Sequence, residues 1–212
     1  MSLATWWYED PRPELVPLEG LAVCSSEDDA LLANMARLPL AEIAARRAAG
    51  HRPYIAYLEG TPAAYGWVAT RVASIGELEL TVTLPAGNRY LWDFATLPAF
   101  RGRGVYPHLL AEIARRESPP ATRLWIIHAP ENLPSGIGIS RAGFQPVTEL
   151  SFDPDGRPAL APLVEGPRLA AAAALLGLPL VEAALAPCWG CGGCSCEHDE
   201  AGRCPCAIEP HR

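Results

Sequence analysis

The chain has 212 residues, of which 50% are hydrophobic and 19% charged, and its formal net charge is −7 at pH 7. This composition excludes an intrinsically disordered chain and fits one well-buried domain with an appendage. The negative charge argues against nucleic acid as a main partner, because phosphate binding needs a basic face.

The first residues and the longest apolar stretch bear on the cellular compartment. Residues 1–13 lack the basic start and apolar run of a secretory signal peptide. Gly177 and Pro179 interrupt the apolar stretch Leu169–Ala186, which favours a buried pair of helices over a membrane span. We therefore expect a cytoplasmic protein with no membrane partner.

Apolar periodicity and turn residues predict helices and strands in chain order. Residues 1–20 are an entry segment in which a first strand is left open, Ser25 or Ser26 caps the first helix, and Gly50 ends the second. The helices and strands expected before residue 100 are helices at 27–37 and 38–49 and strands at 52–58, 63–72, 77–84 and 90–96.

The second half alternates between strands and helices. Helix 103–117 has one apolar stripe, formed by Val105, Leu109, Leu110 and Ile113. It is followed by strand 124–128, helix 135–142, strand 145–152, a Pro-rich loop at 153–167 with room for one more strand, and a broken helix at 169–186. This order predicts a mixed α/β domain, an α+β mixed sheet with one crossover.

Residues 93–106 combine a strand, a basic glycine-rich loop and a helix start. Gly102 and Gly104 let the backbone approach an anion, and the free amides and dipole of the helix start favour its charge. Arg101 and Arg103 add positive charge, so the segment suits a diphosphate. It lacks the Gly-Lys-Ser/Thr of a Walker loop and the third glycine of a dinucleotide fingerprint. A plain strand-to-helix turn with solvated arginines is the alternative.

The same segment resembles motif A of the GCN5-related N-acetyltransferase (GNAT) family, which Pro98, Arg101 and Gly104 match. Downstream, residues 131–135 and 142–144 resemble motif B, with its Asn at position 132 and its closing Gly-Phe. The resemblance covers residues 20–150. It implies a GNAT-like acyl-CoA N-acyltransferase fold, here with a helical and Cys-rich C-terminal extension, and acetyl-CoA as the co-substrate.

The resemblance also implies roles for particular residues. The backbone of residues 94–96 would pair with the pantetheine arm, the amides of the glycine loop would hold the diphosphate, and a side-chain amide of motif B would bond the arm. The expected cofactor-binding residues are Phe94, Ala95, Thr96, Arg101, Gly102, Arg103, Gly104, Val105, Tyr106 and Asn132. Two departures from the family are Tyr106, where a small residue is usual, and Pro107, which has no amide proton.

Acetyl transfer to an amine requires removal of a proton from the ammonium and protonation of the leaving thiolate. Asp93 and His128 are the candidates for the base, although a strand-end histidine bonded to backbone and a solvated aspartate are open alternatives. The tyrosine that many family members use as the acid is replaced by Ile139, so Tyr106, Ser140 or water must protonate the thiolate. The catalytic candidates are therefore His128, Asp93 and Tyr106.

The function predicted by this resemblance is transfer of an acetyl group from acetyl-CoA to a primary amine of a small molecule or peptide. A homodimer is left open. The motif-B pattern of protein N-terminal acetyltransferases is absent, since Ile127 stands in place of their glutamate. One alternative is a catalytically weak acyl-CoA-binding module whose cysteine tail senses metal or redox state. Another is a protein chiefly concerned with handling metal.

The end of the chain is rich in cysteine. Cys-x-x-Cys and Cys-x-Cys spacings bring thiolates within reach of one ion, and His198 could replace one of them. We expect a metal site formed by Cys188, Cys191, Cys194, Cys196, Cys204 and Cys206, for which zinc is one candidate metal. A reduced or partly disulfide-linked tail without metal is the alternative. The predicted units are residues 1–165 for the transferase domain, 166–187 for a helical segment and 188–212 for the tail.

Overall fold

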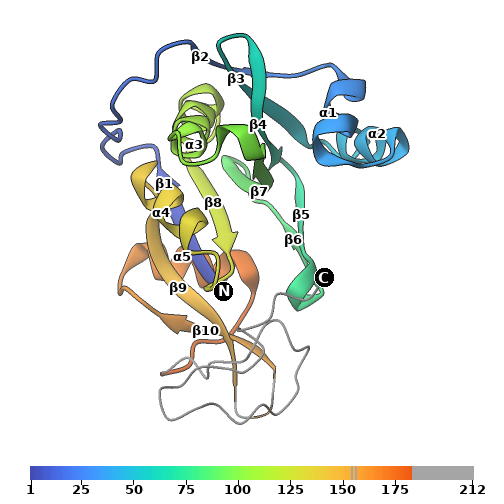
Figure 1. The fold of residues 1–212 in the computed structure, drawn as a ribbon. Helices are drawn as coiled ribbons and strands as arrows, with labels where there is room; N and C mark the ends of the chain where they lie inside the picture. Colours follow the sequence, from blue (N-terminus) through green and yellow to red (C-terminus); the bar gives the residue numbers. More distant parts are fainter. Residues whose placement is uncertain (154, 156, 183–212) are drawn as a thin grey trace, which may run out of the picture.

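A computed structural model describes residues 1–153, 155 and 157–182 of the chain. Eight strands form one mixed sheet, with helices packed on both of its faces (Figure 1). The expected mixed α/β class is confirmed. The six cysteines of the predicted metal module lie outside the described residues. Within the described part of the chain, no group of three or more His, Cys, Asp or Glu side chains is arranged to hold a metal ion.

The described residues form more strands than helices, and the helices are short. The strands of the large sheet are β1 (Ser2–Trp7), β2 (Leu21–Ser25), β3 (Arg52–Leu58), β4 (Thr61–Ala69), β7 (Asn88–Thr96), β8 (Arg123–His128), β9 (Gln145–Phe152) and β10 (Pro158–Pro162). A separate hairpin consists of β5 (Val72–Ile75) and β6 (Leu80–Thr83). The α-helices are α1 (Asp29–Ala36), α2 (Leu40–Ala48), α3 (Val105–Glu117), α4 (Leu133–Arg141) and α5 (Pro167–Leu176).

The strand order is β10-β9-β1-β8-β7-β4-β3-β2, and β7 and β8 are the parallel pair, joined by the crossover helix α3. The first strand of the chain, β1, lies in the middle of the sheet, antiparallel to both β8 and β9. A local pattern cannot predict this position, because the partners of β1 lie more than a hundred residues later. The entry segment therefore contributes a core strand, and Leu3 is fully buried.

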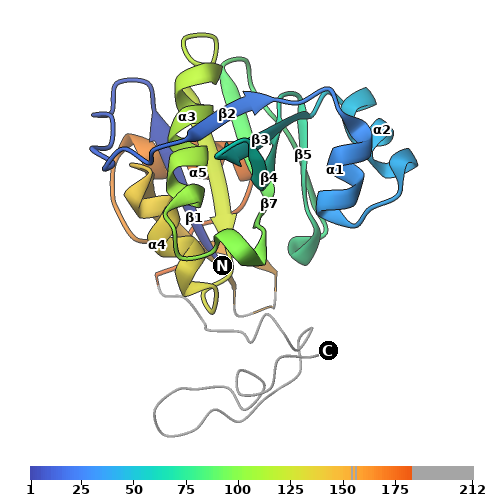
Figure 2. The same cartoon turned by 45° about the horizontal axis from the view of Figure 1, so that its top comes forward.

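Alternating side chains divide the sheet into two covered faces. On one face, the predicted stripe of α3 is buried, with Leu109, Leu110 and Ile113 at 0% exposure, and it packs on Leu124 and Ile126 of β8. The opposite face is covered by α1 and α2 over β3 and β4, and by α5 and the β5–β6 hairpin over β1 and β8. Figure 2 shows α3 in front of the sheet, with α1 and α2 at the right of the picture.

Several element boundaries differ from the prediction. The cap of α1 is Asp28, whose carboxylate accepts from the Leu31 amide at 2.8 Å, rather than Ser25 or Ser26. The strand expected at 77–84 is shortened to β6, because residues 76–78 form a 3₁₀ turn. The strand left open in the Pro-rich loop exists as β10. No helix in the described ranges has the length and apolar character needed to cross a membrane.

Candidate functional site

The parallel strands β7 and β8 separate part-way along their length. They pair from Asn88 and Arg123 as far as Leu91 and Ile126, after which β7 continues to Thr96 (Figure 1). In the described part of the chain, no strand pairs with this last part of β7 on its β8 side. An unpaired edge presents backbone N–H and C=O groups that an extended ligand can bind. This edge contains residues 94–96, the segment expected to pair with pantetheine.

A bulge lies on β7 at the point where the strands have separated. Tyr65 pairs with Ala95 and Trp67 with Trp92, so two residues of β7 stand opposite Gly66 of β4. Asp93 is one of the two, with φ of 50° in the left-handed region. Such a bulge takes backbone groups out of the ladder and turns them toward a new direction. The sequence prediction contained Asp93 but not the bulge.

The ring of Phe94, the other residue of the bulge, occupies the space over Gly66. A Cβ added to Gly66 would lie 2.0 Å from Cε1 of Phe94, so the ring rests directly on the glycine backbone. The ring of Tyr106, near the start of α3, lies 5.7 Å from that of Phe94. A Cβ on Gly138 of α4 would in turn lie 2.4 Å from Tyr106. Two aromatic rings thus fill the distance from β4 to α4, with a glycine at each end.

The glycine loop has the geometry expected of an anion site. Gly102 and Gly104 have φ of 73° and 78°, and Gly104 is the N-cap of α3. No carbonyl of the described residues accepts from the amides of Gly102, Arg103 or Gly104. A Cβ at Gly102 would meet nothing within 4 Å, so the loop is open around this glycine. The residues present therefore fit a diphosphate group.

The two arginines of the loop lie in different surroundings. The Nε of Arg101 donates to the carbonyl of Thr96 at 3.2 Å and so ties the loop to the end of β7. The guanidinium of Arg103 lies 5.8 Å from the ring centre of Phe100. Both residues are exposed, which leaves their remaining N–H groups accessible to an anion. Pro107 occupies the third position of α3, where it removes one of the free amides.

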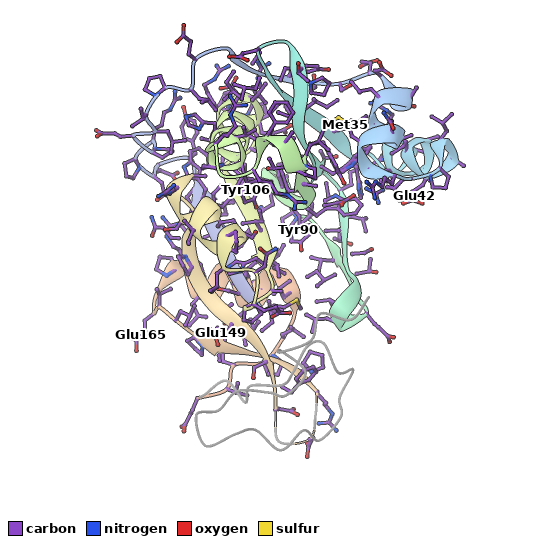
Figure 3. The ribbon with its side chains drawn as sticks, viewed as in Figure 1. Met35, Glu42, Tyr90, Tyr106, Glu149 and Glu165 are labelled. Atoms are coloured by element: carbon purple, nitrogen blue, oxygen red, sulfur yellow. The ribbon has the colours of Figure 1, made fainter. Side chains whose placement is uncertain are left out.

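Tyr106 lies near the start of α3 (Figure 3) and packs against Gly138 of α4. Its hydroxyl is 3.3 Å from Oγ of Ser135 in the first turn of α4. Burial raises the pKa of Tyr106 to about 12, so the phenol is protonated at neutral pH. A protonated phenol is a hydrogen-bond and proton donor, and this one stands between the segments that follow β7 and β8.

The predicted residues Asn132 and His128 lie where β8 passes into α4. The Asn132 side chain is the N-cap of α4 and accepts from the Ser135 amide at 3.2 Å, which leaves its NH₂ group available as a donor. The ring of His128 packs against Gly136, where a Cβ would lie 2.9 Å from Cε1. Its Nδ1 is 3.0 Å from the Ala129 carbonyl. The backbone-bonded histidine considered as an alternative is thus present, with Nε2 without a partner among the described residues.

On the opposite face of the sheet, α2 reaches the bulge through Arg46. Arg46 forms ion pairs with Asp93 and with Glu42, the latter at 2.9 Å. Its guanidinium carbon lies 4.5 Å from the ring centre of Trp92 and 5.3 Å from that of Trp67. The sequence analysis missed Arg46 and both tryptophans, because the contact joins helix and strand over a long separation.

His51 completes this side of the bulge. Its ring lies 5.1 Å from that of Trp92, edge to face. Nε2 is 3.2 Å from the Val72 carbonyl, so Nε2 carries the proton and donates. Burial, aided by the nearby charge of Arg46, lowers the pKa of His51. The imidazole is therefore neutral at neutral pH, beside a fixed guanidinium.

This chain is similar to known proteins in structure and not in sequence. No family model matches the sequence, and no curated protein does. The structure is similar to a GCN5-related N-acetyltransferase from Kribbella flavida, at 14% identity over 68% of this chain and 53% of that one, with a TM-score of 0.44. The chain thus spans about half the length of that protein.

Two further solved structures are similar. One is an acetyltransferase from Trypanosoma brucei, at 18% identity over 59% of this chain and 92% of that one, with a TM-score of 0.40. The other is the aminoglycoside acetyltransferase AAC(6')-Ib in complex with coenzyme A and kanamycin, at 19% identity over 66% of this chain and 92% of that one, with a TM-score of 0.45. These proteins are described as acetyltransferases.

Proposed function

We propose that this protein is an N-acetyltransferase that moves an acetyl group from acetyl-CoA to a primary amine of a small molecule or peptide. The observation that carries the proposal is a conjunction at one end of β7. There the strand separates from β8, bulges at Asp93, and leads into a glycine loop whose amides are free at the start of α3. This arrangement suits an extended ligand with a diphosphate at one end and a reactive group at the other.

In this proposal, each part of the chain has one task. The unpaired edge of β7 at residues 94–96 binds the amides of the pantetheine arm, and the NH₂ group of Asn132 bonds it from the other side. The amides from Gly102 to Tyr106 hold the diphosphate. Bound acetyl-CoA supplies an acetyl thioester, which the bulge at Asp93 orients beside the face covered by α2.

The proposed reaction requires the nitrogen to lose two protons and the sulfur to gain one. The amine nitrogen forms a bond to the acetyl carbon while the bond from that carbon to sulfur breaks. His128 or Asp93 accepts the first proton, which the ammonium loses before attack. Tyr106 gives a proton to the departing sulfur, and the second proton, which the nitrogen loses as the amide forms, returns to the Tyr106 phenolate directly or through water. Tyr106 is protonated at neutral pH and so has a proton to give, and its raised pKa makes it a weaker acid than a solvent-exposed phenol. The ion pair of Asp93 with Arg46 favours a positioning role for this carboxylate over that of a free base.

Calorimetric titration of acetyl-CoA into the wild type and Gly104→Asp tests the binding half of the proposal. We expect Gly104→Asp to abolish binding, because a carboxylate would stand before the free amides. Gly166→Asp is the matched control. Gly166 is also a helix N-cap, with φ of 96° and nothing within 4 Å of an added Cβ, but it opens α5. Equal affinity in wild type and Gly104→Asp would remove the site from this loop.

Transfer of labelled acetyl groups across a panel of primary amines, followed by mass spectrometry, tests the catalytic half. We expect at least one amine to gain an acetyl group in the wild type and none in Gly104→Asp. Tight binding of acetyl-CoA without transfer to any amine would instead favour the acyl-CoA-binding module.

A further inference from the structure

Residues 8–20 join β1 to β2 and pass outside α3 in both views (Figures 1 and 2). We call this segment the strap. The Tyr8 amide donates to the Thr122 carbonyl at 2.9 Å, and the Val16 carbonyl is 2.9 Å from Nε2 of His108. At Pro13 the strap touches Gly143, where an added Cβ would lie 3.3 Å from the proline ring. The strap is thus fixed at several points over the outer surface of α3.

A cavity of ≈ 490 Å³ lies between the strap, β2 and α3. Its apolar lining includes Trp6, Leu15 and Val23. On the α3 side, the cavity is lined by the small side chains of Ala111 and Ala114. Small-molecule sites in proteins commonly have volumes of roughly 300–1,000 Å³ with a largely apolar lining. This cavity has both properties, and it lies on the outer side of α3, away from the separated strands β7 and β8.

The polar lining of the cavity carries an excess of positive charge. Arg12, Arg115 and Arg116 line it, against the single carboxylate of Glu112. Glu112 accepts from both Arg115 and Arg116 at 2.7 Å, so one carboxylate serves two guanidinium groups. Arg12, on the strap, has no carboxylate partner in the described part of the chain. The cavity therefore has an unbalanced positive charge, as expected of a binding site for an anion.

Trp6 gives a second, independent indication. Its side chain lines the cavity and is only 4% exposed, and its indole N–H has no hydrogen-bond partner among the described residues. A buried N–H without an acceptor is costly, and such groups commonly find their partner in water or a ligand. An oxygen-bearing ligand within reach of this N–H would supply that acceptor.

We propose that this cavity is a second binding site, for a small organic anion with an apolar body, such as a medium-chain or aromatic carboxylate. Arg12 and the Arg115–Arg116 pair hold the carboxylate, and the apolar body lies against Trp6, Leu15 and Val23. The site is separate from the glycine loop, but the ring of His108 lies against both the loop and the strap. Nδ1 of His108 is 2.7 Å from the carbonyl of Gly104, and Nε2 of the same ring is 2.9 Å from the Val16 carbonyl of the strap.

Calorimetric titration of the full-length protein with sodium octanoate, and separately with the neutral octanamide, tests the proposal. We expect octanoate to bind at least ten times more tightly than octanamide, because only the carboxylate meets the guanidinium groups. Arg12→Gln should weaken octanoate binding by roughly fivefold. Arg141→Gln makes the same charge change at an exposed position of α4, away from the cavity, and should bind like the wild type.

Ala111→Phe fills the cavity from the surface of α3 and should abolish octanoate binding. Circular dichroism and the urea midpoint establish that this variant is folded, and Arg12→Gln provides the second test should it not be. Absence of octanoate binding to the wild type, equal binding of octanamide, or undiminished octanoate binding in a folded Ala111→Phe would each overturn the proposal.

Discussion

The guanidinium of Arg46 on α2 is bonded to the carboxylate of Asp93, the left-handed residue of the β7 bulge. The same guanidinium lies over the rings of Trp67 and Trp92, and its side chain is only 12% exposed. Ion pairs at exposed sites contribute little, but this cation is fixed by two rings and two carboxylates. Arg46 therefore fixes the backbone direction of the bulge, where the thioester is proposed to lie.

Arg46→Met should lower kcat by about 10–100-fold while leaving acetyl-CoA affinity within a few-fold of wild type. Misplacement of a reacting group by about 1 Å can cost 10²-fold in rate, whereas the glycine loop does not touch Arg46. Arg47→Met is the matched control, because Arg47 pairs with Asp29 at 2.6 Å on the same helix but away from the bulge. Steady-state kinetics of both variants check the prediction, and equal losses in the two would contradict it.

Asp93→Asn and its combination with Arg46→Met separate positioning from proton transfer. If Asp93 only positions the bulge, the double variant should be no slower than either single variant, because each substitution removes the same Arg46–Asp93 interaction. A loss of roughly 10²–10⁴-fold in Asp93→Asn alone, well beyond that of Arg46→Met, would assign the base to Asp93.

The glycine loop was predictable from the sequence because all of its determinants are local. Two glycines, two arginines and the start of an apolar helical stripe occur within a few residues, and the structure confirms the strand, the loop and the helix in this order. The α3 stripe was predictable for the same reason, since periodicity alone identifies its buried face.

The bulge and the central position of β1 could not be predicted in this way. Asp93 is in a left-handed conformation, the ring of Phe94 occupies the space over Gly66, and Arg46, 47 residues earlier, bonds the Asp93 carboxylate. Both contacts join segments distant in sequence. The same holds for β1, whose neighbours β8 and β9 come from the other end of the described chain.

Tyr106→Phe should lower kcat for acetyl transfer by roughly 10²-fold or more, with little change in acetyl-CoA affinity, if the phenol protonates the leaving sulfur. Phenylalanine keeps the ring contacts with Phe94 and Gly138 and removes only the hydroxyl. Ser135→Ala is the matched control, since it removes the hydroxyl partner at 3.3 Å and keeps the phenol. Steady-state kinetics with saturating amine check the prediction. Full activity of Tyr106→Phe would contradict the prediction and indicate that water protonates the leaving sulfur.

His51 should make the stability of the protein depend on pH. Because burial lowers the pKa of His51 below 6.5, the unfolded state binds more protons than the folded state as the pH falls through that value. The free energy of unfolding should therefore decrease between pH 7.5 and pH 5.5. His51→Gln keeps a donor for the Val72 carbonyl and cannot be protonated, so its stability should fall less over this range. Urea denaturation of both proteins at the two pH values measures the difference, and identical pH dependence would contradict the prediction.

Glu117, the last residue of α3, connects that helix to the sheet. Its side chain is 1% exposed and accepts from Tyr54 Oη at 2.8 Å and from Arg89 Nε at 3.0 Å. Burial and the nearby carboxylate of Glu117 both raise the pKa of Tyr54, so the phenol donates throughout the neutral range. Arg52 adds a third contact at 3.0 Å, from a side chain that is 54% exposed.

Glu117→Ala should lower the free energy of unfolding by about 3–5 kcal/mol, because it leaves the buried guanidinium of Arg89 without its carboxylate. The matched control is Glu112→Ala on the same helix. Glu112 is 25% exposed and its partners Arg115 and Arg116 can turn to water, so this change should cost less than about 1 kcal/mol. Urea denaturation measures both values. Similar losses in the two variants would mean that the contacts of Glu117 contribute no more than a surface ion pair, and that α3 is held on the sheet by its apolar stripe alone.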